Sequence, residues 1–441
     1  MNPDIMFKKN SIFIIVFILI IGMLFSCQKP KELSEPIVKL ISPLENSQVQ
    51  VPDTLEICFK IQSDHSIKSV AASIVNGNYI SITGTSTINE PETETENKIN
   101  ILIRDQHKLN EAPYYIKVAV NDGTGIWNSY FAIQLANKPL LYKGFYLFSR
   151  PGIHQTKIGF YDQDLNDTSL FYINGEYVES SISGMYNKLF IATETRVKLG
   201  AHSIGENILE WDIDSQFPNP GFTDIQLDEN RIYAGMQSGQ IAGYSQLNGQ
   251  QKFVTELLLD TFPEKICVLE EYIIGDYLAR IGGNKTIVTF YKETGVKKHR
   301  RPINMKVVSM LNTPEPNAAL VIGNEDGKGK IALYNANNNF FEYSHQIDEG
   351  PIIGVSELDN NYILLTIDQS MYVYNLKQNM ITLLANFQDI PENIYFEQNT
   401  NQIIVLFEKN IKFLLYPGLN EIASLEFENT LQGLQLYYQY D

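Results

Sequence analysis

The feature that most constrains this chain is a repeat of about 42 residues, a length typical of blade-type and solenoid repeats. A strand-like run ends in an aromatic residue and is followed by a polar turn, as in QIAGYSQLNG and KIALYNANN. The positions where the runs end are Tyr161, His202, Tyr244, Tyr291, Tyr334, Tyr374 and Tyr416. Seven units of one kind therefore follow one another between residue 138 and the end of the chain.

A second series of strand-like runs has the same spacing and precedes the first series in every unit. Its members are apolar on both faces, for example KLFIAT, RIYAGM and ALVIGN. Two such series leave room for about four strands per unit, which is the size of a β-propeller blade. The 25 Tyr and 23 Phe fit this interpretation, because large rings fill the wedge between blades. We therefore predict a seven-bladed β-propeller over residues 138–441 and regard its aromatic residues as packing residues.

The ring of blades also has to close. The chain enters the repeats with a second-strand pattern, GFYLFS, and it leaves them with an unpaired strand, LQGLQLYYQY. We predict that this last strand completes the first blade, because the pairing would cover two free sheet edges at once.

The strand and turn at YSQLNG and YKETG resemble the broad propeller group that includes the quinoprotein-like and WD40-like repeats. The resemblance covers roughly 300 residues and is shallow. A Trp-Asp pair occurs once, at Trp211-Asp212, and the adjacent cysteines of quinoprotein enzymes and a sialidase-type Asp box are absent from the sequence.

Residues 37–137 contain seven short alternating runs separated by turn signals, which is the pattern of a two-sheet β-sandwich. The segments at Ile41-Ser42-Pro43 and Val120-Asn121-Asp122-Gly123 resemble the Ig-like modules of bacterial surface proteins. The polar stretch 87–97 is expected to be a solvated loop. The predicted fold class is thus all-β, an Ig-like β-sandwich followed by a seven-bladed β-propeller.

The first 26 residues have the form of a targeting segment. Lys8 and Lys9 precede an apolar run over 12–25, which is shorter than the roughly 20 residues of a transmembrane helix. Leu24-Phe25-Ser26-Cys27 resembles the lipobox of Bacteroidota-like lipoproteins. The resemblance implies cleavage before Cys27 and acylation of that residue, with residues 27–36 as an extended tether. It also implies an outer-membrane lipoprotein, on the periplasmic side or at the cell surface; an uncleaved anchor or an ordinary secretory signal remains an alternative.

Charge and motif content restrict the chemistry. The formal net charge is −17, with 51 acidic and 34 basic residues, which argues against nucleic acid as a partner. Cys58 and Cys267 lie in strand-like runs and are interpreted as two buried thiols, with a disulfide between them as the alternative. The histidines lack metal-ligand spacing, and no H-E-x-x-H, G-x-S-x-G or Walker-type loop occurs in the sequence. We therefore assign no catalytic, metal or cofactor-binding residue.

Two short segments have a functional and a structural interpretation. The alternating oxygen-bearing residues of Asp162–Asp167, DQDLND, resemble the start of a calcium loop, but Asp167 and Ile173 replace the Gly and Glu that such a loop needs. An exposed hairpin turn is the preferred interpretation. The basic cluster Lys297–Arg301 suits an anionic partner, and a solvated loop is preferred there.

Two functional hypotheses follow. The first is a non-catalytic binding or scaffolding lipoprotein, anchored in the bilayer through Cys27, with a protein or glycan partner on a propeller face; it resembles the propeller lipoproteins that assist outer-membrane assembly. Glycan capture would require Tyr or Trp exposed on one rim. The alternative is an extracellular polysaccharide hydrolase or lyase with two carboxylates in the central funnel.

Overall fold

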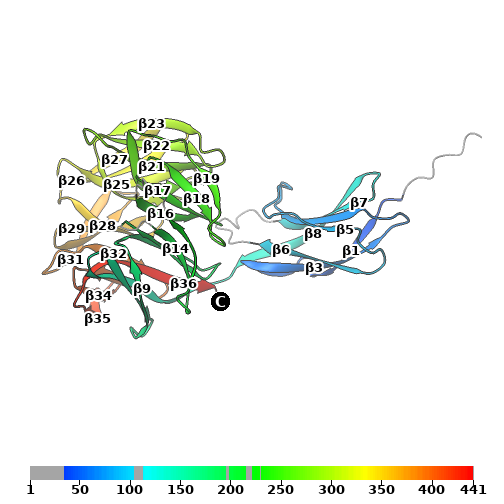
Figure 1. The fold of residues 1–441 in the computed structure, drawn as a ribbon, viewed down its shortest axis with the longest axis horizontal. Helices are drawn as coiled ribbons and strands as arrows, with labels where there is room; N and C mark the ends of the chain where they lie inside the picture. Colours follow the sequence, from blue (N-terminus) through cyan, green and yellow to red (C-terminus); the bar gives the residue numbers. More distant parts are fainter. Residues whose placement is uncertain (1–33, 104–112, 195–197, 215–220, 229, 441) are drawn as a thin grey trace, which may run out of the picture. The chain divides into compact units, whose positions relative to one another are not determined.

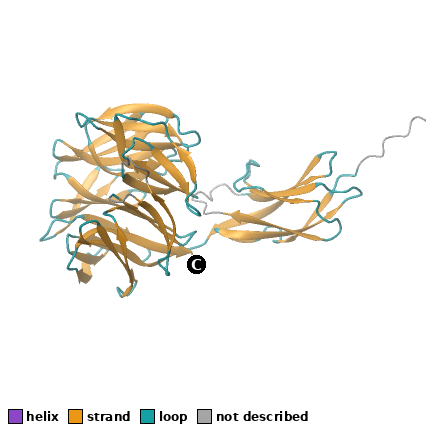
Figure 2. Ribbon diagram, in the orientation of Figure 1, coloured by secondary structure: helices purple, strands orange, loops and turns teal. Residues whose placement is uncertain are grey.

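A computed structural model describes residues 34–103, 113–194, 198–214, 221–228 and 230–440 (Figure 1). Its regular structure consists of strands (Figure 2). Within the described ranges, no helix is long and apolar enough to span a bilayer. The chain divides into two compact units, residues 1–137 and 138–441.

The described part of the first unit contains eight strands in two sheets. The three-stranded sheet has the order β1 (Ile37–Ser42), β3 (Asp53–Gln62) and β6 (Glu96–Ile103). The five-stranded sheet has the order β2 (Gln48–Val51), β8 (Ile126–Asn137), β7 (Tyr114–Asn121), β4 (Ser69–Val75) and β5 (Ser86–Asn89). β2 and β8 are parallel, and every other strand pair described in this unit is antiparallel.

One apolar core lies between these two sheets. Phe59 and Ile101 come from the three-stranded sheet, and Val70, Ile116 and Val118 come from the five-stranded sheet; each is at most 1% exposed. The first unit is therefore a β-sandwich. The expected count of seven strands was one too low, because the four-residue strand β2 is too short to show an alternating pattern. The stretch 87–97, expected as a loop, contains the end of β5 and the start of β6.

The described strands of the second unit form seven four-stranded antiparallel sheets, which are the blades of a propeller. We number the blades along the ring from the one that contains β9. The first to third blades are β36 (Thr430–Tyr440), β9 (Leu140–Gly152), β10 (Gln155–Asp162), β11 (Asp167–Asn174); β12 (Tyr177–Ser183), β13 (Lys188–Thr193), β14 (Lys198–Ser203), β15 (Leu209–Asp214); and β16 (Phe222–Asp228), β17 (Arg231–Met236), β18 (Ile241–Ser245), β19 (Gln251–Val254).

The remaining four blades follow the same order from the first to the fourth strand. They are β20 (Thr261–Val268), β21 (Tyr272–Ala279), β22 (Lys285–Tyr291), β23 (Lys297–Ile303); β24 (Lys306–Asn312), β25 (Ala318–Glu325), β26 (Lys328–Asn335), β27 (Phe340–Ile347); β28 (Ile352–Asp359), β29 (Tyr362–Ile367), β30 (Ser370–Asn375), β31 (Met380–Asn386); and β32 (Asn393–Glu397), β33 (Gln402–Leu406), β34 (Asn410–Leu415), β35 (Asn420–Glu426). The predicted all-β propeller is confirmed.

The C-terminal strand closes the ring, as the sequence predicted. β36 pairs with β9 in an antiparallel register that places Leu434 opposite Leu147 and Gln435 opposite Tyr146 (Figure 1). Leu434 lies in one core cluster with Phe413 of the seventh blade and Phe145 of the first. The last strand therefore joins the two ends of the chain's repeat region.

The end of each third strand has a conserved local geometry across the blades. Among the described strand pairs, a β-bulge directly precedes this position in six blades, and the residue there is buried in five of them and partly buried at Tyr161. In the fourth blade the buried residue is Phe290, whereas Tyr291 is 41% exposed. In the seventh blade it is Leu414, and Tyr416 lies beyond the strand. The expected positions 291 and 416 were therefore wrong by one and two residues.

The polar turn after this position explains the Asn and Gly residues of the repeat. Five residues after the buried position, the backbone has a positive φ in six described blades, at Asn207, Gly249, Gly295, Asn339, Asn379 and Leu419. Asn and Gly tolerate this left-handed conformation best. In two blades a tyrosine also fixes the turn, because the hydroxyls of Tyr334 and Tyr374 donate to Asn339 and Asn379 at 2.9 Å.

Candidate functional site

The residues singled out from the sequence lie apart from one another. Cys27 falls outside the described residues. The Asp162 carboxylate accepts hydrogen bonds from the backbone N–H groups of Asp164 and Asn166 at 2.9 Å, so the segment is a hairpin turn between β10 and β11. Cys58 and Cys267 are buried free thiols, as predicted. No cluster of three His, Cys, Asp or Glu side chains suited to a metal occurs in the described part of the chain.

The basic cluster Lys297–Arg301 is not a loop but the fourth strand of its blade, β23. Lys298 lies over the Tyr272 ring, with its Nζ 4.0 Å from the centroid, and donates to the Tyr272 hydroxyl at 2.7 Å. Arg301 donates to the carbonyl of Asn339 in the next blade at 2.8 Å. Part of this positive charge therefore holds the fourth and fifth blades together.

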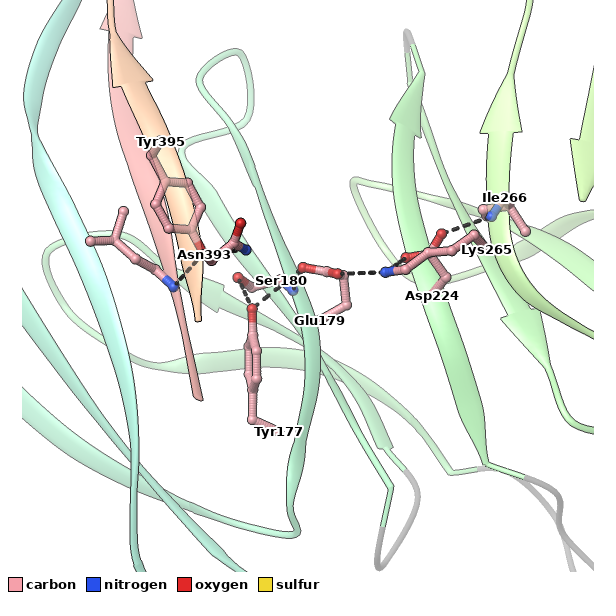
Figure 3. A network of polar contacts seen from close by, with 9 residues as sticks. Tyr177, Glu179, Ser180, Asp224, Lys265, Ile266, Asn393 and Tyr395 are labelled. Atoms are coloured by element: carbon pink, nitrogen blue, oxygen red, sulfur yellow. Dashed lines mark hydrogen bonds and ion pairs between the residues drawn. The ribbon is translucent and has the colours of Figure 1, made fainter. Parts of the chain in front are cut away.

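The most concentrated polar site is formed by the first strands of the blades. A β-bulge interrupts the pairing of first and second strands in six described blades, and the residue after it is Gly433, Glu179, Asp224, Lys265, Ser309 or Gly354 in ring order. Bulges re-aim side chains, and here they bring three charged side chains from consecutive blades together (Figure 3). The Lys265 ammonium lies 3.3 Å from both the Glu179 and the Asp224 carboxylates.

Burial dominates the electrostatics of this charged cluster. Asp224 is 6% exposed and also accepts a hydrogen bond from the backbone N–H of Ile266 at 2.8 Å. Burial raises the pKa of Asp224 to about 6 against the opposing effect of Lys265, and the negative charge of Glu179 adds to the rise. The Asp224 charge in turn raises the pKa of Lys265, so the ammonium stays protonated between the two acids.

Two tyrosines extend the cluster toward the seventh blade (Figure 3). The Tyr177 hydroxyl lies 3.0 Å from the Ser180 hydroxyl and donates to Glu179 at 3.4 Å. The Tyr395 hydroxyl accepts hydrogen bonds from Asn393 at 3.1 Å and from the backbone N–H of Leu434 at 3.2 Å. Burial raises the pKa of both tyrosines, so both hydroxyls remain neutral.

A second lysine lies between two acids in the fourth blade. Lys285 pairs with Asp276 at 2.8 Å and with Glu264. Asp276 is fully buried, and burial raises its pKa to about 6 despite the nearby ammonium. Its second oxygen, Oδ1, has no hydrogen-bond partner among the described residues. Asp276 is the Cα partner of Lys265 in the pairing of β20 with β21.

Exposed apolar side chains gather on two loops of the third and fourth blades. Leu257 and Leu259 lie on the β19–β20 connection and are 48% and 75% exposed, and Ile281 on the β21–β22 turn is 90% exposed. Arg280 joins the two loops, because its side chain donates to the carbonyl of Leu259 at 2.9 Å and its backbone N–H to that of Asp260 at 2.9 Å. We call Leu257, Leu259 and Ile281 the loop-tip residues.

The sandwich carries a surface cluster of three tyrosines, Tyr79, Tyr115 and Tyr130. The ring of Tyr79 stacks on Tyr115 with centroids 5.8 Å apart and meets Tyr130 edge-on at 4.9 Å. Tyr79 is 58% exposed and has a φ of 62°, a strained conformation for a bulky residue. Asn76 fixes this turn, since its side-chain oxygen accepts the backbone N–H groups of Asn78 and Ile80 at 3.0 Å.

Comparisons with known proteins identify no family. No family model and no curated protein matches the chain. Among solved structures, the chain is similar to Sqt1 of Saccharomyces cerevisiae (11% identity, TM-score 0.49, 66% of this chain and 88% of that one). It is also similar to the β-propeller domain of Myceliophteria thermophila Cps50 (Swd1) (10%, 0.48, 59% and 89%) and to BamB from Moraxella catarrhalis (14%, 0.42, 68% and 88%). The assignment of a propeller rests on the strand order of the seven sheets themselves.

Proposed function

We propose that this protein is a membrane-anchored lipoprotein whose propeller is a non-catalytic binding or scaffolding module for a protein partner. The observation that carries the binding role is the group of loop-tip residues, which remain exposed on loops that Arg280 holds in place. Apolar side chains on ordered loops suit a protein surface, because less conformational entropy is lost on binding than from flexible loops. The anchor rests on the lipobox-like segment that ends at Cys27.

The anchor has a direct test. Cells that express the protein are fed a labelled fatty acid, and the mature chain is examined by mass spectrometry. We expect a mature chain that begins at Cys27 and carries the label, and a Cys27→Ala variant without label. A wild-type chain that retains residues 1–26, or that carries no lipid, would refute the anchor.

The sandwich is proposed to be an Ig-like spacer between the tether and the propeller. The N-terminal segment of the sandwich contributes one strand to each sheet, since β1 pairs with β3 and β2 pairs with β8. The next strands also follow the immunoglobulin order: β3 and β6 share one sheet, and β4, β7 and β8 share the other. Limited proteolysis at the junction near residue 138 should release two separately folded units; one cooperative unit resistant to cleavage would argue against a spacer.

The alternative hydrolase or lyase needs two carboxylates that act as acid and base. Glu179 and Asp224 are two neighbouring acids, but both pair with the Lys265 ammonium, and they accept hydrogen bonds from the Tyr177 hydroxyl and the backbone N–H of Ile266. This arrangement supports a structural role that ties three blades together. Polysaccharide breakdown that is lost in an Asp224→Asn variant of unchanged stability would restore the enzymatic hypothesis.

Glycan capture is a second candidate, because the tyrosine cluster of the sandwich exposes aromatic rings of the kind that stack on sugars. Its position differs from the expectation, which placed such residues on a propeller rim. Glycan-array binding that is lost in Tyr79→Ala and kept in Tyr172→Ala would support it. Tyr172 is a suitable control because it is 51% exposed and lies on β11 of the propeller.

A further inference from the structure

A cavity of about 360 Å³ lies between the fifth and sixth blades. Its position at the turns 313–315, 360 and 376–377 places it on the face formed by the first-to-second and third-to-fourth strand connections. The volume is within the range of ligand pockets. Its apolar walls are Leu311, Leu320, Leu333, Tyr343, Ile363 and Leu376.

At this cavity, two blades depart from the residue pattern that the other five share. One first-strand residue of each blade pairs with an equivalent apolar residue of the second strand, in ring order Phe145, Leu189, Ile232, Ile273, Ala319, Ile363 and Ile403. This first-strand residue is apolar in five blades, and each packs in a core cluster: Leu436, Ile182, Leu227, Val268 and Phe396. In the fifth and sixth blades the same position holds Asn312 and Glu357, and both line the cavity. The cavity is therefore a site where polar groups replace packing residues.

The polar side chains of the cavity differ in the hydrogen bonds that they already make within the protein. The Asn312 side-chain oxygen accepts the Cys267 thiol at 3.0 Å. One Asp359 oxygen accepts the backbone N–H groups of Asn361 and Tyr362 at 2.7 and 3.0 Å. The Glu357 side chain is exposed, and among the residues that the structure describes its carboxylate has no hydrogen bond or ion pair.

The cavity is also unbalanced in charge. Three acidic side chains, Glu315, Glu357 and Asp359, line it together with one basic side chain, Lys377. Burial raises the pKa of Glu357, and the charge of Asp359 adds to the rise. A cation placed in the cavity would reverse that effect, because an opposite charge nearby favours the ionised carboxylate.

We propose that this cavity receives an arginine or lysine side chain of the protein partner. The cation would pair with Glu357, and the methylene groups of its stem would pack on the leucine and isoleucine walls, as amphipathic cationic side chains do. This inference rests on the proposed function, since it names a second contact with a protein partner, on the propeller face opposite the loop-tip residues.

The test uses small probes, so that it does not depend on the partner. The full chain is titrated with N-acetyl-arginine amide, with its uncharged analogue N-acetyl-citrulline amide, and with agmatine, while ligand-observed NMR measures Kd. We expect binding of the arginine probe, at least about tenfold weaker binding of the citrulline probe, and at least about tenfold weaker arginine binding by Glu357→Gln, which corresponds to about 1.4 kcal/mol.

Two further variants separate the pocket from general charge effects. Glu357→Leu restores the apolar residue of the other blades and should fill the cavity and abolish binding. Glu392→Gln removes one exposed negative charge that does not line the cavity, and it should bind like the wild type. Thermal unfolding checks that all variants fold.

Each result decides the proposal. Equal binding by Glu357→Gln and wild type, equal binding of the citrulline probe, or no binding of the arginine probe would overturn it. Binding of agmatine without binding of the blocked arginine would show a site for a free small cation and overturn the side-chain assignment. If the arginine probe binds and no partner is captured from membranes, the pocket stands and the proposed function fails.

Discussion

Deletion of residues 429–441 should unfold the propeller, because it removes β36 from the first blade. Leu431, Leu434 and Tyr437 are each at most 5% exposed. Burying one large apolar side chain is worth about 1.5–3 kcal/mol, so the three together contribute about 5–9 kcal/mol. That sum is comparable to the whole stability of a domain, about 5–15 kcal/mol. The deletion also exposes the free edge of β9 that β36 now covers.

Differential scanning calorimetry on the full chain and on the deletion variant measures this effect. We expect loss of the propeller's cooperative transition in the variant. A shorter deletion of 439–441 keeps all three buried residues and should leave the transition within a few degrees of the wild type. A synthetic peptide of residues 429–441 added in trans should restore part of the transition. An unchanged melting temperature after the long deletion would refute ring closure.

Two further predictions concern the buried charges. Lys265→Met leaves Glu179 and Asp224 without a cation, and it should lower the free energy of unfolding by about 3 kcal/mol, measured by urea unfolding at pH 7. The control Lys412→Met removes an exposed ion pair and should lower the free energy of unfolding by at most about 1 kcal/mol. Equal losses would contradict a buried cluster. The folded-state pKa of Asp276, about 6, exceeds its ordinary value of 3.8, so its contribution to stability is present below about pH 4 and is lost as pH rises to 6. Between pH 4 and 6, the free energy of unfolding of Asp276→Asn should therefore rise relative to that of the wild type by up to about 3 kcal/mol. Parallel curves of this free energy against pH would contradict the raised pKa.

The sequence predicts the second and third strands of the blades because these strands are buried on both faces and repeat regularly. Their apolar runs, such as KLFIAT and RIYAGM, become β13 and β17. The outer strand β23 was missed, because a free edge exposed to water tolerates the charges of Lys297–Arg301. The turn residues were recognised as Asn and Gly, and their positive φ values supply the reason.

The charged cluster of the first strands could not be predicted from the sequence. Glu179, Asp224 and Lys265 occupy equivalent positions only after a β-bulge shifts the register of each first strand. A bulge adds one residue to a strand and so destroys the period of two on which sequence patterns depend. Once the register is known, the same alignment exposes Asn312 and Glu357 as exceptions in an otherwise apolar series.

The proposed role has two parts: the propeller binds a protein partner, and Cys27 holds the chain at a membrane. The most direct measurement is chemical cross-linking in membranes of cells that express the full chain, with the adduct identified by mass spectrometry. We predict one adduct of fixed stoichiometry that disappears in Leu259→Glu and Ile281→Glu and persists in Leu383→Glu, an equally apolar position 50% exposed on β31. Absence of a specific adduct, or one that all three variants retain, would contradict the claim.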